Sequence, residues 1–114
     1  MRTLWVIGAG LSILQIIIGN IMMLYEVIKS LLYLHIAIGI ALFGFSLFCL
    51  RYAKRDIIRR MLLGNIGLIV ITGILGLIWL FAVKSPIIPI IHLFLALGLV
   101  SNFSVMYGIE RGTS

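Results

Sequence analysis

The chain has 114 residues, of which 63% are hydrophobic and only 11% are charged. A soluble domain of this length cannot bury so much apolar surface, so the composition excludes the soluble globular classes and indicates an integral membrane protein. The formal net charge is +6. The position of the basic residues, described below, explains that charge by membrane orientation, and we expect no nucleic-acid partner.

Four apolar runs are each long enough to cross a hydrocarbon core of about 30 Å, which needs about 20 helical residues. In chain order they cover residues 4–25, 31–50, 61–83 and 87–107. The first run is too long for a cleavable signal peptide and has no small-residue cleavage site. Short connections make consecutive helices antiparallel neighbours. The sequence therefore predicts an all-α membrane protein, an up-down-up-down four-helix bundle that forms one domain over residues 1–114.

The basic residues predict the orientation of this bundle. One side of the predicted bundle carries seven of them, namely Arg2, Arg51, Lys54, Arg55, Arg59, Arg60 and Arg111. The other side carries only Lys29 and Lys84. The positive-inside rule then places both termini and the 51–60 connection in the cytoplasm. We expect a multi-pass protein of a prokaryotic plasma membrane, surrounded by the lipid bilayer.

The two halves of the chain resemble each other. A shift of 57 residues without gaps places His35 on His92 and Gly19 on Gly76, although only eight of the 57 positions are identical. Each half reads as one helix that leaves the cytoplasm and one that returns with a histidine near its start. The pattern predicts an internal two-helix repeat about an axis along the membrane normal.

His35 and His92 are the only histidines, and both lie inside apolar spans. At 1.5 Å per residue, we expect both about 6–8 Å below the outer boundary. A polar side chain inside a membrane indicates a functional site, and two neutral imidazoles at one depth are suited to a haem iron. The alternatives are a polar contact between helices, a proton relay or another metal. A mononuclear metal enzyme is disfavoured because no carboxylate or thiolate lies near the pair.

Small residues near the histidines predict a slot for a flat cofactor. Gly39 and Ala96 follow the two histidines by one helical turn. Gly19 and Gly76 lie on the first and third spans near the same level, where they leave room for a macrocycle.

The two outer lysines predict the polar edge of the same site. Lys29 and Lys84 each lie in the connection before a histidine, where they can meet haem propionates. Met22 and Met23 lie at a suitable depth for axial ligands, but packing explains them better.

These residues resemble those of the haem A synthases. The pattern Gln15-x-x-x-Gly19-x-x-Met22 is similar to the odd-helix pattern of that family, and the two histidines resemble its even-helix ligands. Family members typically contain two four-helix halves, each with a histidine pair near the outer face, and some archaeal members look like a single half. The resemblance implies a haem b between His35 and His92, and a homodimer would restore eight helices.

One departure narrows what the resemblance implies. The catalytic half of the family has Glu three residues before its first histidine, where this chain has Leu32. The paired cysteines of some members are also missing. The chain is therefore more similar to the half that carries haem b without oxidising a haem, and we assign no enzyme activity.

Three functions remain open. The first is a bis-histidine cytochrome b that exchanges electrons near the outer face with a quinol or a redox partner protein. The second is a haem-free structural subunit of a larger respiratory complex such as a terminal oxidase. The third, a small multidrug-type transporter, is disfavoured because such proteins need an acidic residue within the first span, and Glu26 lies at or beyond its outer end.

Overall fold

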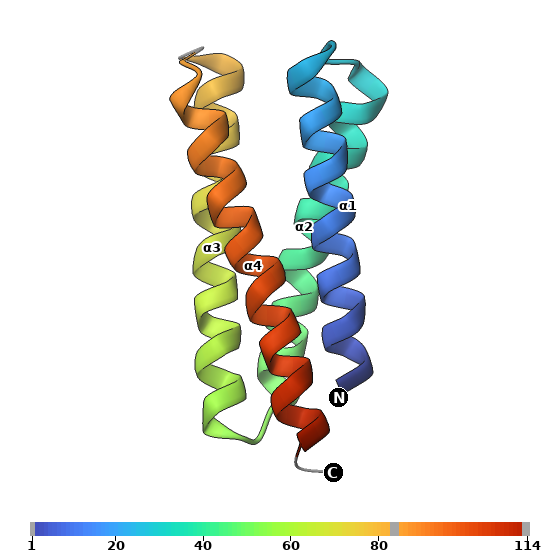
Figure 1. The fold of residues 1–114 in the computed structure, drawn as a ribbon, viewed down its shortest axis with the longest axis vertical. Coiled ribbons are helices and arrows are strands. Elements are labelled where there is room, and N and C mark those ends of the chain that lie inside the picture. Colours follow the sequence, from blue (N-terminus) through green and yellow to red (C-terminus); the bar gives the residue numbers. More distant parts are fainter. Residues whose placement is uncertain (1, 83–84, 113–114) are drawn as a thin grey trace.

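The computed structural model describes residues 2–82 and 85–112 and consists of four long helices. They are α1 (Arg2–Leu24), α2 (Lys29–Tyr52), α3 (Asp56–Phe81) and α4 (Ile87–Gly112). Figure 1 shows them lying side by side along one long axis, with both termini at the same end. Each helix is long and apolar enough to cross a membrane. The predicted class, four apolar spans and no other element in the described residues, is confirmed.

The helices extend beyond the predicted apolar runs. Between α2 and α3 only residues 53–55 are outside a helix, whereas the sequence predicts a connection of ten residues. The guanidinium of Arg59 donates to the carbonyl oxygens of Leu50 (2.8 Å) and Ala53 (3.1 Å), which satisfies acceptors at the end of α2. Hydropathy marks where the apolar surface ends, but backbone hydrogen bonding carries each helix further into its polar flanks.

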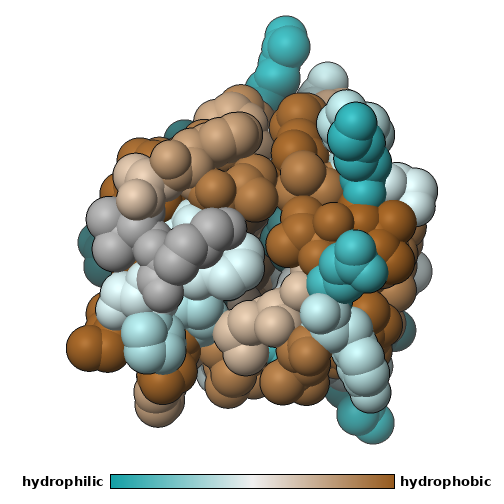
Figure 2. Space-filling model, turned by 90° about the horizontal axis from the view of Figure 1, so that it is seen from above, coloured by the Kyte–Doolittle hydropathy of each residue, from teal (hydrophilic) through white to brown (hydrophobic). Residues whose placement is uncertain are grey.

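The helices form a closed ring in which each contacts two neighbours. Helix α1 packs against α2 and α4, and α3 packs against the same two helices. Helices α2 and α4 therefore face each other diagonally. We call the end with both termini and residues 53–55 the terminal end, and the opposite end the distal end (Figure 1). Figure 2 looks onto the distal end, where apolar side chains dominate and a few polar ones project.

Most of the buried core lies in the terminal half of the bundle. The Phe103 ring is its centre: it is fully buried, its centroid is 6.5 Å from that of Trp5, and 6.2 Å from that of Phe45. Gly8 leaves the space that this ring occupies, since a Cβ there would lie 2.7 Å from Phe103 Cε1. The glycine and the aromatic ring therefore make one close contact between α1 and α4.

The same half contains a buried polar contact. The side chain of Asn65 in α3 is fully buried; its Nδ2 donates to the sulfur of Met106 at 3.6 Å. Its Oδ1 accepts from Nδ2 of Asn102 in α4 at 2.9 Å. The expectation that asparagines join helices to each other is confirmed for this pair. Thr72 differs, because its hydroxyl donates to Leu68 and Ile69 of its own helix.

The distal half is packed less closely. None of the described residues in 66–81 of α3 or 87–98 of α4 is buried, although Ile18, Met22 and Ile38 are buried on the side of α1 and α2. The space between the two helix pairs is a cavity of about 570 Å³. The fold thus combines a closed terminal half with an open distal half.

Candidate functional site

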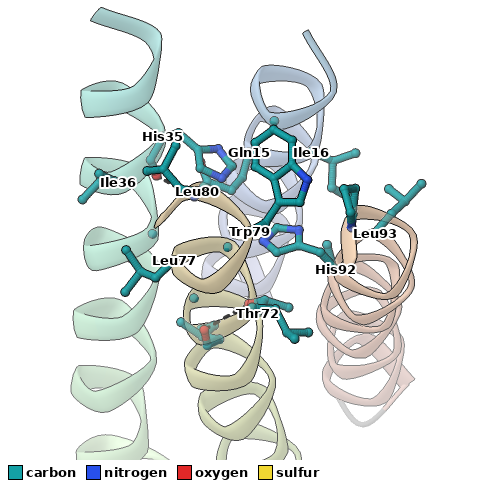
Figure 3. A pocket seen from close by; sticks show the side chains of 18 of the residues that line it. Gln15, Ile16, His35, Ile36, Thr72, Leu77, Trp79, Leu80, His92 and Leu93 are labelled. Carbon is teal, nitrogen blue, oxygen red and sulfur yellow. Dashed lines mark hydrogen bonds between the residues drawn. The ribbon is translucent and has the colours of Figure 1, made fainter. Parts of the chain in front are cut away.

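The structure brings the two histidines together across the distal cavity. His35 comes from α2 and His92 from α4, so they approach each other along the diagonal of the bundle. Their ring centroids are 6.3 Å apart and the ring planes make an angle of 34°. Both rings are half-buried and line the same cavity. Figure 3 shows them entering it from opposite helices.

Each histidine lies against a glycine of the neighbouring odd-numbered helix. A Cβ at Gly19 of α1 would lie 3.2 Å from Cε1 of His35, which is closer than an ordinary van der Waals contact. A Cβ at Gly76 of α3 would lie 3.6 Å from Nε2 of His92. The two contacts involve residues that are related by the shift of 57. The proposed repeat thus has a counterpart in the packing, where each half places one glycine against one imidazole.

The smaller residues one turn further along also line the cavity. Gly39 and Ala96 belong to its wall, as the sequence predicts. Gly39 also admits the amide of Gln15, since a Cβ at this position would lie 3.2 Å from Gln15 Nε2. Leu32, which stands where the catalytic half of the haem A synthases has Glu, is a further wall residue.

The lysines are placed differently from the expectation. Lys29 is the first residue of α2 and not part of the connection, because the helix begins earlier than the apolar run. Its side chain is exposed and does not line the cavity. Lys84 lies outside the described residues. The structure therefore supplies no lysine contact to the cavity from the residues that it describes.

Two wall residues escaped the functional interpretation of the sequence. Gln15 Nε2 donates to the backbone oxygen of His35 at 2.6 Å, so its role as a helix-joining residue is confirmed, but it also lines the cavity. Trp79 of α3 lines the cavity too, and Figure 3 shows its indole beside the pair. The available signal was spacing: Trp79 follows Gly76 by three residues, which places both on one helix face.

The chemistry available in the cavity is limited to a few polar groups. The two imidazoles and the Gln15 amide lie among mostly aliphatic side chains. Among the residues that the structure describes, no group of three or more His, Cys, Asp or Glu gathers to hold a metal ion. The arrangement offers two nitrogen ligands and an apolar enclosure. No protein-family model, curated protein or solved structure matches the chain.

Proposed function

We propose that this protein is a small membrane cytochrome b that holds one haem b between His35 and His92. The observation that carries the proposal is the approach of the two imidazoles across one cavity, with ring centroids 6.3 Å apart. Intramembrane histidines are costly unless they have a partner, and a shared iron would give one partner to both.

The spacing of the rings fits ligands of one metal ion. Two metal–imidazole bonds of about 2 Å each, with about 1 Å from each nitrogen to its ring centre, separate the ring centres by about 6 Å. The cavity of about 570 Å³ lies within the range of about 300–1,000 Å³ that is usual for cofactor sites. Gly19 and Gly76 support the fit further, because larger side chains there would meet the imidazoles.

The residues around the pair favour electron exchange over reaction with a substrate. When bound, a haem with two histidine ligands supplies one-electron redox chemistry and has no open iron position. The aliphatic wall excludes water from the imidazoles, and the diagonal placement on α2 and α4 holds them apart. Leu32 in this wall supplies no acid–base group, which supports holding a haem b without oxidising it, as in the non-catalytic half of the haem A synthases.

The charge distribution supports an orientation with the terminal end in the cytoplasm of a prokaryote. All seven basic residues of the first group belong to the terminal end, and Lys29 lies at the distal end. The histidines would then lie near the outer face of the plasma membrane, so a quinol or an extracytoplasmic redox protein is the expected partner. In a Cys49→Ser background, a membrane-impermeant thiol reagent should label Val27→Cys but not Lys54→Cys in intact cells. The reverse pattern would contradict this orientation.

The haem itself is tested by spectroscopy of the purified protein. A pyridine haemochrome assay should detect haem b, and a reduced-minus-oxidised spectrum should show a b-type α band. His35→Ala and His92→Ala should each lose or strongly alter the band, whereas the control Ser104→Ala, in α4 and exposed, should keep it. A missing band in the native protein, or one unchanged in both histidine variants, refutes the proposal. Haem-free recovery with larger membrane subunits would instead support the structural-subunit alternative.

A further inference from the structure

The two histidines differ in how their ring nitrogens are enclosed. Nδ1 of His35 is buried and has no hydrogen-bond partner. It is the only ring nitrogen of the pair with this property among the described residues. A buried polar atom in an apolar bundle is costly unless a partner satisfies it. Nε2 of His35 is consequently the nitrogen that remains for a ligand in the cavity.

The side-chain amide of Gln15 is satisfied at one end only. Its Nε2 donates to the backbone oxygen of His35 at 2.6 Å, and Gly39 leaves the room that the amide needs. Its Oε1 is also buried and has no partner. The amide oxygen can only accept a hydrogen bond, whereas an imidazole nitrogen donates in one of its two tautomers. The two unpartnered atoms are therefore chemically complementary, and they lie on the packed helices α1 and α2.

We propose that Gln15 is the positioning residue of His35, with Oε1 accepting the hydrogen of Nδ1 while Nε2 of the amide holds the His35 backbone. The two atoms are not hydrogen-bonded in this structure, and a small rotation of the amide or the ring would join them. Fixing the Nδ1–H tautomer leaves the lone pair of His35 Nε2 directed at the cavity, as for other metal-binding histidines. The role toward haem rests on the proposed function, but the tautomer does not.

The second half of the chain has no equivalent of Gln15. The position 57 residues later is Thr72, whose hydroxyl donates to Leu68 (2.8 Å) and Ile69 (3.0 Å) within α3. His92 therefore receives no such contact from the helix beside it. The two imidazoles are thus unequal, with the better-fixed one on α2, and Thr72 is a matched control for Gln15.

The tautomer is measured on the haem-free protein in detergent micelles. With ¹⁵N-labelled histidine, assigned through the single-histidine variants, the His35 resonances should show the Nδ1–H form in the native chain. Gln15→Met, which has a similar shape but no donor or acceptor, should shift His35 toward the Nε2–H form. Thr72→Val should leave both histidines unchanged. A native His35 in the Nε2–H form overturns the inference, and this result needs neither haem nor a folded variant.

The consequence for the cofactor is measured as a midpoint potential. A hydrogen bond at Nδ1–H makes the ligating nitrogen more basic and favours the oxidised metal. Gln15→Met should therefore raise the potential, and we expect a tenfold shift of the reduction equilibrium, about 59 mV for a one-electron couple. Thr72→Val should leave the potential unchanged. An unchanged potential in haem-loaded Gln15→Met overturns the inference and leaves the proposed function intact. A native protein without haem refutes the proposed function, and the tautomer then decides on Gln15 alone.

Discussion

The terminal and distal halves of the bundle use glycine in opposite ways. In the terminal half, Gly8 makes room for the Phe103 ring, and the space is filled by the chain itself. In the distal half, Gly19 and Gly76 each lie against an imidazole at the edge of a cavity of about 570 Å³. The difference teaches that a small residue indicates a site only where no side chain of the same protein fills the space beside it.

The internal repeat explains how one chain contains both arrangements. In the terminal half the two repeats diverge in size: Phe103 stands where the first repeat has Ser46, and Asn65 where it has Gly8. Large residues of one repeat thus meet small residues of the other, and the interior closes. In the distal half the repeats keep the same glycine and the same histidine. Equal small residues on both sides leave space between the helix pairs.

Removing the central ring of the closed half should have the largest effect. Phe103→Ala should lower the free energy of unfolding by about 2–4 kcal/mol, because a fully buried ring loses its packing contacts and leaves a void. The control Phe94→Ala, on the same helix with 70% of the residue exposed, should change stability by less than about 0.5 kcal/mol. Reversible unfolding in mixed micelles measures both. Similar values for the two variants would contradict the closed core.

Adding a methyl group should separate the halves. Gly8→Ala should destabilise the protein by about 1–3 kcal/mol, because the enclosed Phe103 ring cannot move away. Gly19→Ala should cost less than about 1 kcal/mol, since the His35 ring borders open space. Gly10→Ala, where a Cβ meets nothing within 4 Å, is the control. Equal costs at Gly8 and Gly19 would remove the distinction between a filled and an open half.

Filling the distal cavity should affect the cofactor and spare the fold. Ala96→Phe should reduce haem content at least about tenfold, which corresponds to about 1.4 kcal/mol of binding free energy. The helices should remain, because the ring enters existing space. Gly67→Phe, at an exposed position outside the cavity, should retain haem. Haem content per protein and far-ultraviolet circular dichroism are the measurements. Undiminished haem in Ala96→Phe would place the cofactor elsewhere.

The buried amide pair should show the smallest effect. Asn102→Ala removes the donor to Asn65 Oδ1 and should cost about 0.6 kcal/mol, with about 1.7 kcal/mol as the upper end for hydrogen bonds between membrane helices. Ser104→Ala, whose hydroxyl donates only to Val100 within α4, should be close to neutral. Both are measured by unfolding in micelles. A larger loss for Ser104→Ala would contradict the assignment of this pair as the helix-joining contact.

The sequence by itself determined the four apolar spans, the two histidines and the matching glycines. These properties belong to single residues or to their spacing along a helix, and they require no knowledge of a neighbour. The same reasoning placed Lys29 in a connection and made residues 51–60 a loop, because hydropathy records the edge of the apolar surface and not the last helical hydrogen bond.

Only the tertiary structure decided which small residues border empty space. Gly8 and Gly19 lie on the same helix, yet one faces Phe103 of α4 and the other His35 of α2. The role of Gln15 also depends on where α1 meets the backbone of α2, and Trp79 lines the cavity because α3 and α4 stand apart from the other pair. The physical reason is that a cavity is set by the combined volumes of side chains from several helices. No single stretch of sequence contains that sum.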